Sequence, residues 1–224
     1  MFFRIGGLTM DKKETNKAYL QKELVRLKKK VNRLEAIRNQ CIEIEKELNF
    51  ISTHDTLTGL PCRALIKDHM AWEIAKAERN QTKLAVMVLN LDEFAAINDS
   101  YGQKTGDHLL IELAKRLTNL FRKGDTICRQ WGDEFILILP DFKEEKSVNR
   151  VIEKAMDLVK KPFIFQDETI SITGSMGIAL YPHDGNKVDD LLQSANIAMY
   201  LAKAKGRANY QFYEQGIEDI SLDL

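Results

Sequence analysis

The pattern of apolar and polar positions divides the chain into one long N-terminal helix followed by alternating short strands and helices. Residues 11–52 contain no proline and no glycine, and Lys, Glu, Arg, Gln and Leu predominate there, which is typical of a long helix. Apolar residues recur in alternating steps of four and three, as in a coiled-coil seam, at Leu20, Leu24, Leu27, Val31 and Leu34. After a three-residue step a second register follows, at Ile37, Cys41, Ile44, Leu48 and Ile51.

Two interpretations of this helix stay open. We favour a parallel coiled-coil dimer, because the polar face is wide and the two registers together span most of the segment. The three-residue step between the registers is then a stammer in the heptad pattern. The alternative is a single amphipathic helix that lies on its own domain.

Beyond residue 53 the pattern changes to that of an α/β domain. Residues 54–61 are rich in turn formers and predict a hinge. The run 84–89 is wholly apolar, which favours a strand buried on both faces, and two strands flanking residues 130–133 predict a hairpin. The predicted helices are 62–78, 105–122, 147–160 and 188–204, and the predicted strands are 84–89, 126–129, 134–139, most of 169–181, and 209–213. Strands that alternate with helices predict a mixed central sheet flanked by helices.

Charge and cysteine content narrow the class of protein. The 33 basic and 33 acidic residues cancel, so the chain lacks the long-range field that gathers nucleic acid or an anionic membrane. The cysteines Cys41, Cys62 and Cys128 form no CxxC pair, which argues against a disulfide framework and favours a reducing cytoplasm. Residues 1–10 are too short for a signal-peptide core, and the apolar run 84–91 is interrupted by asparagine. We therefore expect a cytoplasmic protein without a membrane span or a nucleic-acid partner.

The predicted hairpin carries the candidate chemistry. Its tip has the sequence GDEF at residues 132–135, and carboxylates on a tight tip can reach a divalent cation that bridges phosphates. Here the chain resembles the GGDEF family, whose domains condense two GTP molecules into cyclic di-GMP on a fold like that of nucleotidyl cyclases and polymerase palms. The resemblance covers roughly residues 55–213 and rests on DTLTGLPCR, NLDEFAAINDSYGQKTGD, RKGDTICRQWGDEF, SMGIALYP and ANIAMYLAKAKGRANY, in the family's order.

The resemblance implies a metal and catalytic set with one altered member. Asp133 would bind magnesium through its carboxylate and Leu91 through its backbone carbonyl, while Glu134 would be the catalytic or second metal-linked carboxylate. Asn90 stands where the family has a magnesium-binding aspartate. Because an amide offers Mg2+ no charge, we expect the ion to be weakly held or absent.

Two further departures affect the same site. Ala95 replaces a family lysine, which removes a point charge that contacts phosphate. Trp131 replaces the first glycine of the hairpin, where an indole would crowd the triphosphate. The alternative for Trp131 is a surface aromatic packed beside the hairpin.

Residues for substrate binding match the family more closely. Asn98 and Asp107 match the positions that read guanine, and Phe94 belongs to the same substrate-binding set. Lys203 and Arg207, expected on one face of the last helix, match a phosphate-contacting pair. As single residues, the first two are also typical helix caps, and the basic pair is typical of a solvated helix end.

Three other residues have two interpretations each. Asp92 is either a substitute metal ligand that shares a face with residue 90 or, as we favour, the N-cap of a short helix over residues 94–97. Arg122 and Asp125 have the spacing of the family's RxxD inhibitory site for cyclic di-GMP. Their alternative is a basic helix end followed by a turn aspartate.

The predicted organisation of the chain is an N-terminal segment (1–10), a coiled-coil helix (11–52), a GGDEF domain (53–214) and a tail (215–224). Three candidate functions are consistent with this organisation. The favoured one is a degenerate GGDEF domain that binds GTP or cyclic di-GMP with little or no cyclase activity and dimerises through its coiled coil. The second is an active diguanylate cyclase. The third is a structural adaptor that binds no nucleotide.

Overall fold

The computed structural model describes residues 7–215, and the chain divides into one unit that ends at Phe50 and a second that begins at Ile51. The helix α1 (Gly7–Thr53) contains the whole predicted helix. Its seam positions are solvent-exposed in the single chain, as at Leu20, where 61% of the residue surface is accessible. Residues 1–6 and 216–224, which include parts of the predicted N-terminal segment and tail, lie outside the described residues. Within residues 7–215 no helix is both long and apolar enough to cross a membrane.

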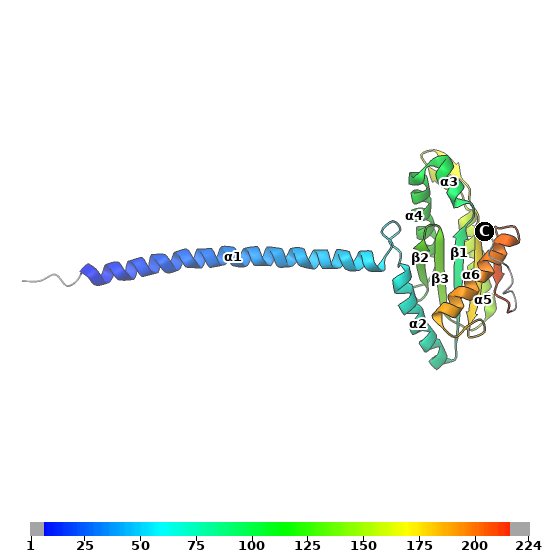
Figure 1. Ribbon diagram of the computed structural model, residues 1–224, viewed down its shortest axis with the longest axis horizontal. Coiled ribbons are helices and arrows are strands. Elements are labelled where there is room, and N and C mark those ends of the chain that lie inside the picture. The colour runs from blue at the N-terminus through cyan, green and yellow to red at the C-terminus, as the bar shows by residue number, and fades with distance from the viewer. Residues whose placement is uncertain (1–6, 216–224) are drawn as a thin grey trace, which may run out of the picture. The chain divides into compact units, whose positions relative to one another are not determined.

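The second unit is an α/β domain built on a five-stranded sheet (Figure 1). Its strands lie in the order β2-β3-β1-β6-β7, with β6 and β7 parallel and the other pairs antiparallel. The predicted mixed sheet flanked by helices is thereby confirmed. In chain order the elements are α2 (Arg63–Asn80), β1 (Lys83–Leu91), α3 (Phe94–Tyr101), α4 (Gln103–Leu120), β2 (Thr126–Trp131), β3 (Glu134–Phe142), α5 (Glu145–Lys160), β4 (Phe163–Phe165), β5 (Glu168–Ile170), β6 (Gly174–Tyr181), α6 (Val188–Ala204) and β7 (Tyr210–Phe212).

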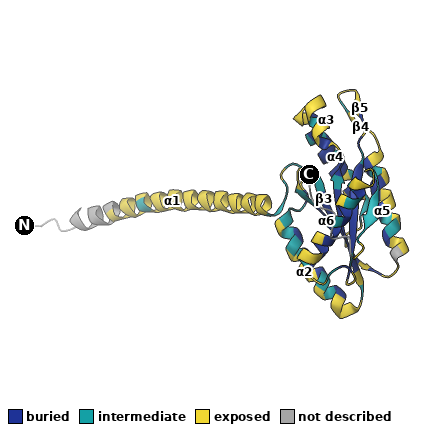
Figure 2. Cartoon of the chain, turned by 45° about the vertical axis from the view of Figure 1, so that its right-hand side comes forward, coloured by how far each residue is buried: buried dark blue, intermediate teal, exposed yellow. Residues whose placement is uncertain are grey.

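The central strand β1 is buried on both faces, which explains its unbroken apolar run. Alternate side chains of a strand point to opposite faces. Val86 and Val88 belong to one core, with residues of α2 and α6, whereas Met87 and Leu89 belong to the other, with residues of α4 and α5. Figure 2 shows the resulting buried centre between exposed outer helix faces. This two-sided burial fixes the C-terminal end of β1, where the candidate site begins.

Close contact between α6 and β6 depends on one glycine. A Cβ atom at Gly177 would lie 2.0 Å from the carbonyl oxygen of Ala195 and 2.1 Å from the backbone nitrogen of Met199. No side chain fits between these backbones, so the absent Cβ allows α6 to lie directly on the sheet.

The predicted strand over residues 169–181 is wrong in part. Its first residues belong to β5, which pairs with β4 in a separate two-stranded sheet, and β6 begins only at Gly174. We did not predict β4. The β4–β5 turn is formed by Gln166 and Asp167, whose φ angles are 48° and 67°. A Gln-Asp pair predicts this left-handed turn far less clearly than an Asn-Gly pair does.

Candidate functional site

The hairpin tip lies against the C-terminal end of β1. In the β1–β3 register Asn90 lies opposite Glu134. The backbone N–H of Leu91 donates to the carbonyl oxygen of Asp133 at 3.2 Å, and Asn90 Nδ2 donates to Asp133 Oδ1 at 3.3 Å. Four residues that sequence comparison assigned to one metal and catalytic set are thus brought together from two strands.

The two carboxylates of the tip are held in a partly desolvated environment. Burial raises the pKa of Asp133 above its ordinary value, and Lys203 and the hydrogen bond from Asn90 oppose this shift only in part. Burial also raises the pKa of Glu134, and the neighbouring Asp133 charge adds to the rise. Gln130 Nε2 donates to Glu134 Oε1 at 2.5 Å. An additional positive charge at this tip would therefore be stabilising.

Trp131 is the last residue of β2, directly before the hairpin turn, and 57% of its surface is exposed. The guanidinium of Arg63, from the first turn of α2, lies 4.4 Å from the centroid of the indole ring. The next residue, Gly132, has a φ of 55°, which a glycine adopts without strain. The indole therefore lies on the surface beside Arg63.

A salt bridge that we did not predict from the sequence joins the hairpin strand β2 to the hinge at residues 54–61. Arg129 Nη1 lies 2.9 and 3.1 Å from the two carboxylate oxygens of Asp55, and Arg129 Nε donates to the carbonyl oxygen of Gly132 at 2.9 Å. Burial alone would raise the pKa of Asp55, but hydrogen bonds from Thr58 and Arg129 outweigh it and hold that pKa below its ordinary value. The sequence offers no sign of this pair beyond the presence of the two residues, because Asp55 and Arg129 lie far apart along the chain.

The guanine-reading candidates lie on the paired helices α3 and α4. Asn98 Oδ1 is buried without a hydrogen-bond partner among the described residues. A Cβ atom at Gly106 would lie 2.0 Å from that oxygen and 3.0 Å from Phe94 Cζ, so the glycine makes room for both side chains. Asp107 follows directly and is half-buried. An unsatisfied buried amide oxygen is a group that a ligand with hydrogen-bond donors would complete.

The expected placement of Lys203 and Arg207 on one helix face is wrong. Lys203 lies in the last turn of α6 and interacts electrostatically with Asp133 and Glu134. The helix ends at Ala204, and Arg207 lies in the turn beyond it with a φ of 60°. The glycine that precedes Arg207 allows this turn, which breaks the four-residue helical spacing.

The expected role of Asp92 as an N-cap is also wrong. Glu93, with a φ of 56°, occupies the N-cap position of α3. The buried Asp92 carboxylate accepts hydrogen bonds from Thr173 Oγ1 at 2.7 Å, Ser175 Oγ at 2.7 Å and the backbone N–H of Ala208 at 3.0 Å. Because these donors occupy both oxygens, Asp92 ties β1 to β6 and to the turn after α6, and it does not contact Asp133 through a hydrogen bond.

Arg122 and Asp125 of the RxxD motif form a pair with each other. The carboxylate of Asp125 accepts bonds from Arg122 Nε at 3.0 Å and from the Arg122 backbone N–H at 3.1 Å. Arg122 Nη2 donates to the carbonyl oxygen of Pro140 at 2.9 Å. Both residues line a pocket of about 350 Å³ between the end of α4 and the start of α5. A ligand bound there would meet an arginine with part of its donor capacity already used.

Comparison with known proteins identifies the family. Residues 52–209 match the family described as diguanylate cyclase, GGDEF domain. The chain belongs to this family. MucR of Pseudomonas aeruginosa, a bifunctional diguanylate cyclase and cyclic di-GMP phosphodiesterase, is 38% identical over 190 residues, which are 83% of this chain and 28% of MucR. The chain thus spans about a quarter of the length of MucR and of the similar relative NbdA.

Solved structures agree with this fold. The GGDEF domain of TpbB from Pseudomonas aeruginosa has a TM-score of 0.71 at 32% identity, covering 73% of this chain and 96% of that one. The GGDEF domain of DgcB from Caulobacter crescentus, in complex with cyclic di-GMP, has a TM-score of 0.67 at 27% identity, covering 73% and 94%. A DgcB structure that includes its coiled coil reaches 0.72 at 24% identity, covering 83% and 98%, and shows likeness of fold alone.

Proposed function

We propose that this chain is a degenerate GGDEF domain of the cyclic di-GMP system that binds GTP or cyclic di-GMP with little or no cyclase activity. The observation that carries the proposal is the hydrogen bond from Asn90 to Asp133. At that point the family has a second carboxylate for magnesium. The reducing cytoplasm, where GTP is available, is the compartment we propose for it.

Retention of nucleotide binding is supported by the α3–α4 pair. The unsatisfied oxygen of Asn98 on α3 and the carboxylate of Asp107 on α4 would both serve as acceptors for the Watson–Crick edge of guanine. Lys203, near the two tip carboxylates, is suited to a phosphate contact. A purine nucleotide would satisfy the buried oxygen, which otherwise costs about 1–3 kcal/mol of stability.

Loss of magnesium affinity is supported by the donor set at the tip. Mg2+ prefers charged oxygen ligands in an octahedral arrangement. Here an amide N–H group points at the carboxylate of Asp133 and uses a lone pair that the ion would need. Among the described residues no three His, Cys, Asp or Glu side chains cluster as a metal site. These residues fit a tightly held Mg2+ poorly.

The other two substitutions reinforce the loss. Ala95 leaves α3 without a phosphate-contacting cation at this position. Trp131, which stacks with the guanidinium of Arg63, adds bulk where the family has a glycine. An active cyclase remains the second candidate because Asp133 and Glu134 are present and adjacent at the tip.

Homodimerisation is supported by the apolar seam of α1. Leu24, Leu27 and Leu34 are each more than half exposed in the single chain, and burial against a second copy would remove them from water. We propose a parallel coiled-coil dimer. The adaptor function, in which the domain binds no nucleotide, would use the same seam.

The central prediction concerns reversion of the three altered positions. Incubation of the protein with GTP and Mg2+ should yield little or no cyclic di-GMP by chromatography. The triple variant Asn90→Asp, Ala95→Lys, Trp131→Gly should gain activity by roughly a thousandfold, because a restored metal ligand supplies several kcal/mol of transition-state stabilisation. Adding Glu134→Gln to the triple variant should abolish the gain.

Calorimetric titration completes this test. Saturable binding of GTP or cyclic di-GMP by the unaltered protein is expected. Clear turnover by that protein would establish the active-cyclase function instead, and absence of binding to either nucleotide would leave only the adaptor function.

A further inference from the structure

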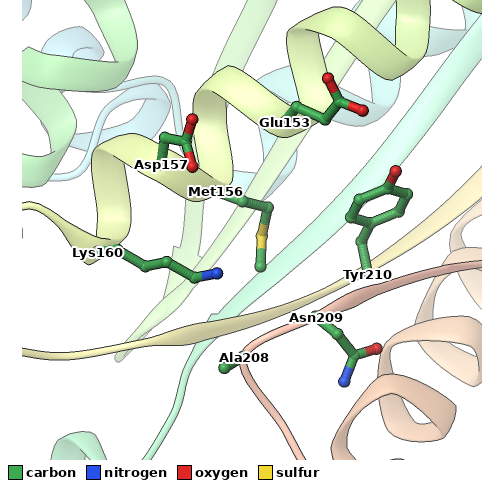
Figure 3. A pocket seen from close by; sticks show the side chains of 7 residues that line it. All are labelled: Glu153, Met156, Asp157, Lys160, Ala208, Asn209 and Tyr210. Atoms are coloured by element: carbon green, nitrogen blue, oxygen red, sulfur yellow. The ribbon is translucent and has the colours of Figure 1, made fainter.

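The pocket shown in Figure 3 adjoins residues already assigned to nucleotide binding. It has a volume of about 270 Å³ and lies between α5 and the turn after α6. Ala208 and Asn209 of its lining directly follow Arg207, which the family resemblance assigns to a phosphate contact. Away from these residues, the fold brings together two cysteines that are far apart in the sequence, Cys62 and Cys128.

A backbone hydrogen bond holds the segments of the two cysteines side by side. The N–H of Arg129 donates to the carbonyl oxygen of Pro61 at 3.1 Å. Cys128 directly precedes Arg129 in β2, and Cys62 directly follows Pro61. Extended segments joined by such a bond lie about 5 Å apart. A disulfide requires Cα atoms roughly 4.4–6.8 Å apart, so the two backbones lie within the separation that a disulfide spans.

The two side chains also belong to one region of the domain. Cys128 is part of the buried core that includes Ile66 of α2. The carbonyl oxygen of Cys62 accepts the N–H of Ile66 at 3.1 Å, so Cys62 begins the helical turn that packs on this core. Burial raises the pKa of Cys128 to about 12, and the charge that Cys62 can carry is the next cause of the rise. Because such an interaction weakens with distance, the two sulfur atoms are near each other.

The two thiols differ in their exposure to solvent. Cys62 is half-buried, and its Sγ donates only a weak bond, to the carbonyl oxygen of Ser52 at 3.4 Å. Cys128 is buried, and its high pKa keeps it protonated at neutral pH, whereas the thiolate is the form that attacks a peroxide. An oxidant from solution therefore reacts first at Cys62. An accessible cysteine beside a second, resolving cysteine is the usual arrangement in redox sensors.

We propose that Cys62 and Cys128 form a reversible disulfide when the protein meets a peroxide. The Cys62 sulfur first attacks one oxygen of hydrogen peroxide, the O–O bond breaks, and a sulfenic acid and water form. The Cys128 sulfur then displaces the hydroxyl group of the sulfenic acid, which leaves with the thiol proton as a second water. The two thiols lose two electrons and two protons in total, and the peroxide is reduced to water. Disulfides of this transient, redox-sensing kind are those found in a reducing cytoplasm.

The disulfide fastens the hinge at residues 54–61 to β2. Cys62 directly follows the hinge, and Cys128 directly precedes Arg129, which binds Asp55 of the hinge through a salt bridge. Oxidation thus adds a covalent link beside an ionic one between the same two segments. Because the link closes a long loop, it restricts the unfolded chain and stabilises the folded domain.

The test uses the full-length Cys41→Ser variant, in which the two cysteines of the pair are the only ones left. Both thiols should react with an alkylating reagent in denaturant before oxidation. After treatment of the folded protein with hydrogen peroxide, neither should react. Peptide mapping without reductant should recover two peptides linked through Cys62 and Cys128. Oxidation should raise the melting temperature by about 5–10 °C, and dithiothreitol should reverse the rise.

The matched control is Cys62→Ser in the same background. Cys62 is the N-cap residue of α2, and serine is favoured at an N-cap, so this variant should fold. It should form no disulfide within the chain, and peroxide should not raise its melting temperature.

Four results would overturn the proposal. Peroxide would leave both thiols of the folded Cys41→Ser variant free, or it would carry Cys62 to the sulfinic acid without a disulfide. Alternatively, the bond would form only in denaturant, or its formation would lower the melting temperature. All these measurements are made without nucleotide, so their outcome does not depend on the proposed binding of GTP or cyclic di-GMP.

Discussion

At the scale of single residues, the candidate base-reading site depends on the absence of a Cβ atom. Gly106 allows the Asn98 oxygen to occupy space that an alanine methyl group would fill, with only 2.0 Å between the two positions. The neighbour is the end of a side chain, so the helix backbone has no need to move. Function is therefore more sensitive than stability to a substitution here.

We predict that Gly106→Ala lowers GTP affinity about tenfold or more, because the displaced Asn98 amide loses a base contact of about 1–3 kcal/mol. The free energy of unfolding should change by less than about 1 kcal/mol, since alanine favours the helical backbone and offsets the crowding. Calorimetric titration and chemical denaturation measure the two quantities. Gly124→Ala is the matched control, because a Cβ atom there meets nothing within 4 Å. Unchanged GTP affinity in Gly106→Ala would remove Asn98 from the binding site.

At the scale of elements, the bond between Asp55 and Arg129 joins the hinge to the strand that leads into the hairpin tip. Arg129 also holds the Gly132 carbonyl, so the tip and the hinge share one side chain. Loss of Asp55 would leave a mostly buried guanidinium without its anionic partner.

We predict that Asp55→Asn lowers the free energy of unfolding by about 1–3 kcal/mol at neutral pH. The folded-state pKa of Asp55 is depressed, so the stabilisation is complete above its unfolded-state pKa of about 3.9 and is lost as pH falls through the folded-state value. The difference between the unaltered protein and the variant should be constant above about pH 5 and shrink below about pH 4. Urea denaturation across this range measures it. A difference that stays constant down to pH 3 would contradict the assigned role, and Asp189→Asn, whose carboxylate is exposed, should change little.

Elements with strong periodicity were predicted well, and the failures have physical causes. The helix α6 matches its predicted bounds of 188–204, because its apolar stripe is complete and a glycine follows soon after. The hairpin β4–β5 was missed because three-residue strands are too short to show alternation. Asp92 was misassigned because its donors come from residues 173, 175 and 208, far away in sequence. Family resemblance assigned Asn90 and Asp133 to one site, but the hydrogen bond between them was not predicted.

At the scale of the whole molecule, the main feature is the row of exposed apolar residues along α1 that we assign to a coiled-coil seam. The proposed loss of cyclase activity concerns the residues of a single domain, whereas the exposed seam of α1 concerns the proposed association of two chains. A parallel coiled coil would bring identical seam residues of two chains into register. Cys41 occupies such a seam position in the second heptad register and is exposed, whereas Cys128 is buried and Cys62 is half-buried.

We predict that the protein sediments as a dimer and that mild oxidation cross-links two chains through Cys41, because equivalent seam positions of parallel helices face each other. Leu27→Glu should raise the dimer dissociation constant about 100-fold or more by burying a charge in the seam. Lys29→Glu, on the outer face of the same turn, should not. Sedimentation velocity and non-reducing electrophoresis measure these effects, with Cys41→Ser as the cross-linking control. A monomer at micromolar concentration, or cross-linking that survives Cys41→Ser, would favour an α1 helix that packs on its own chain.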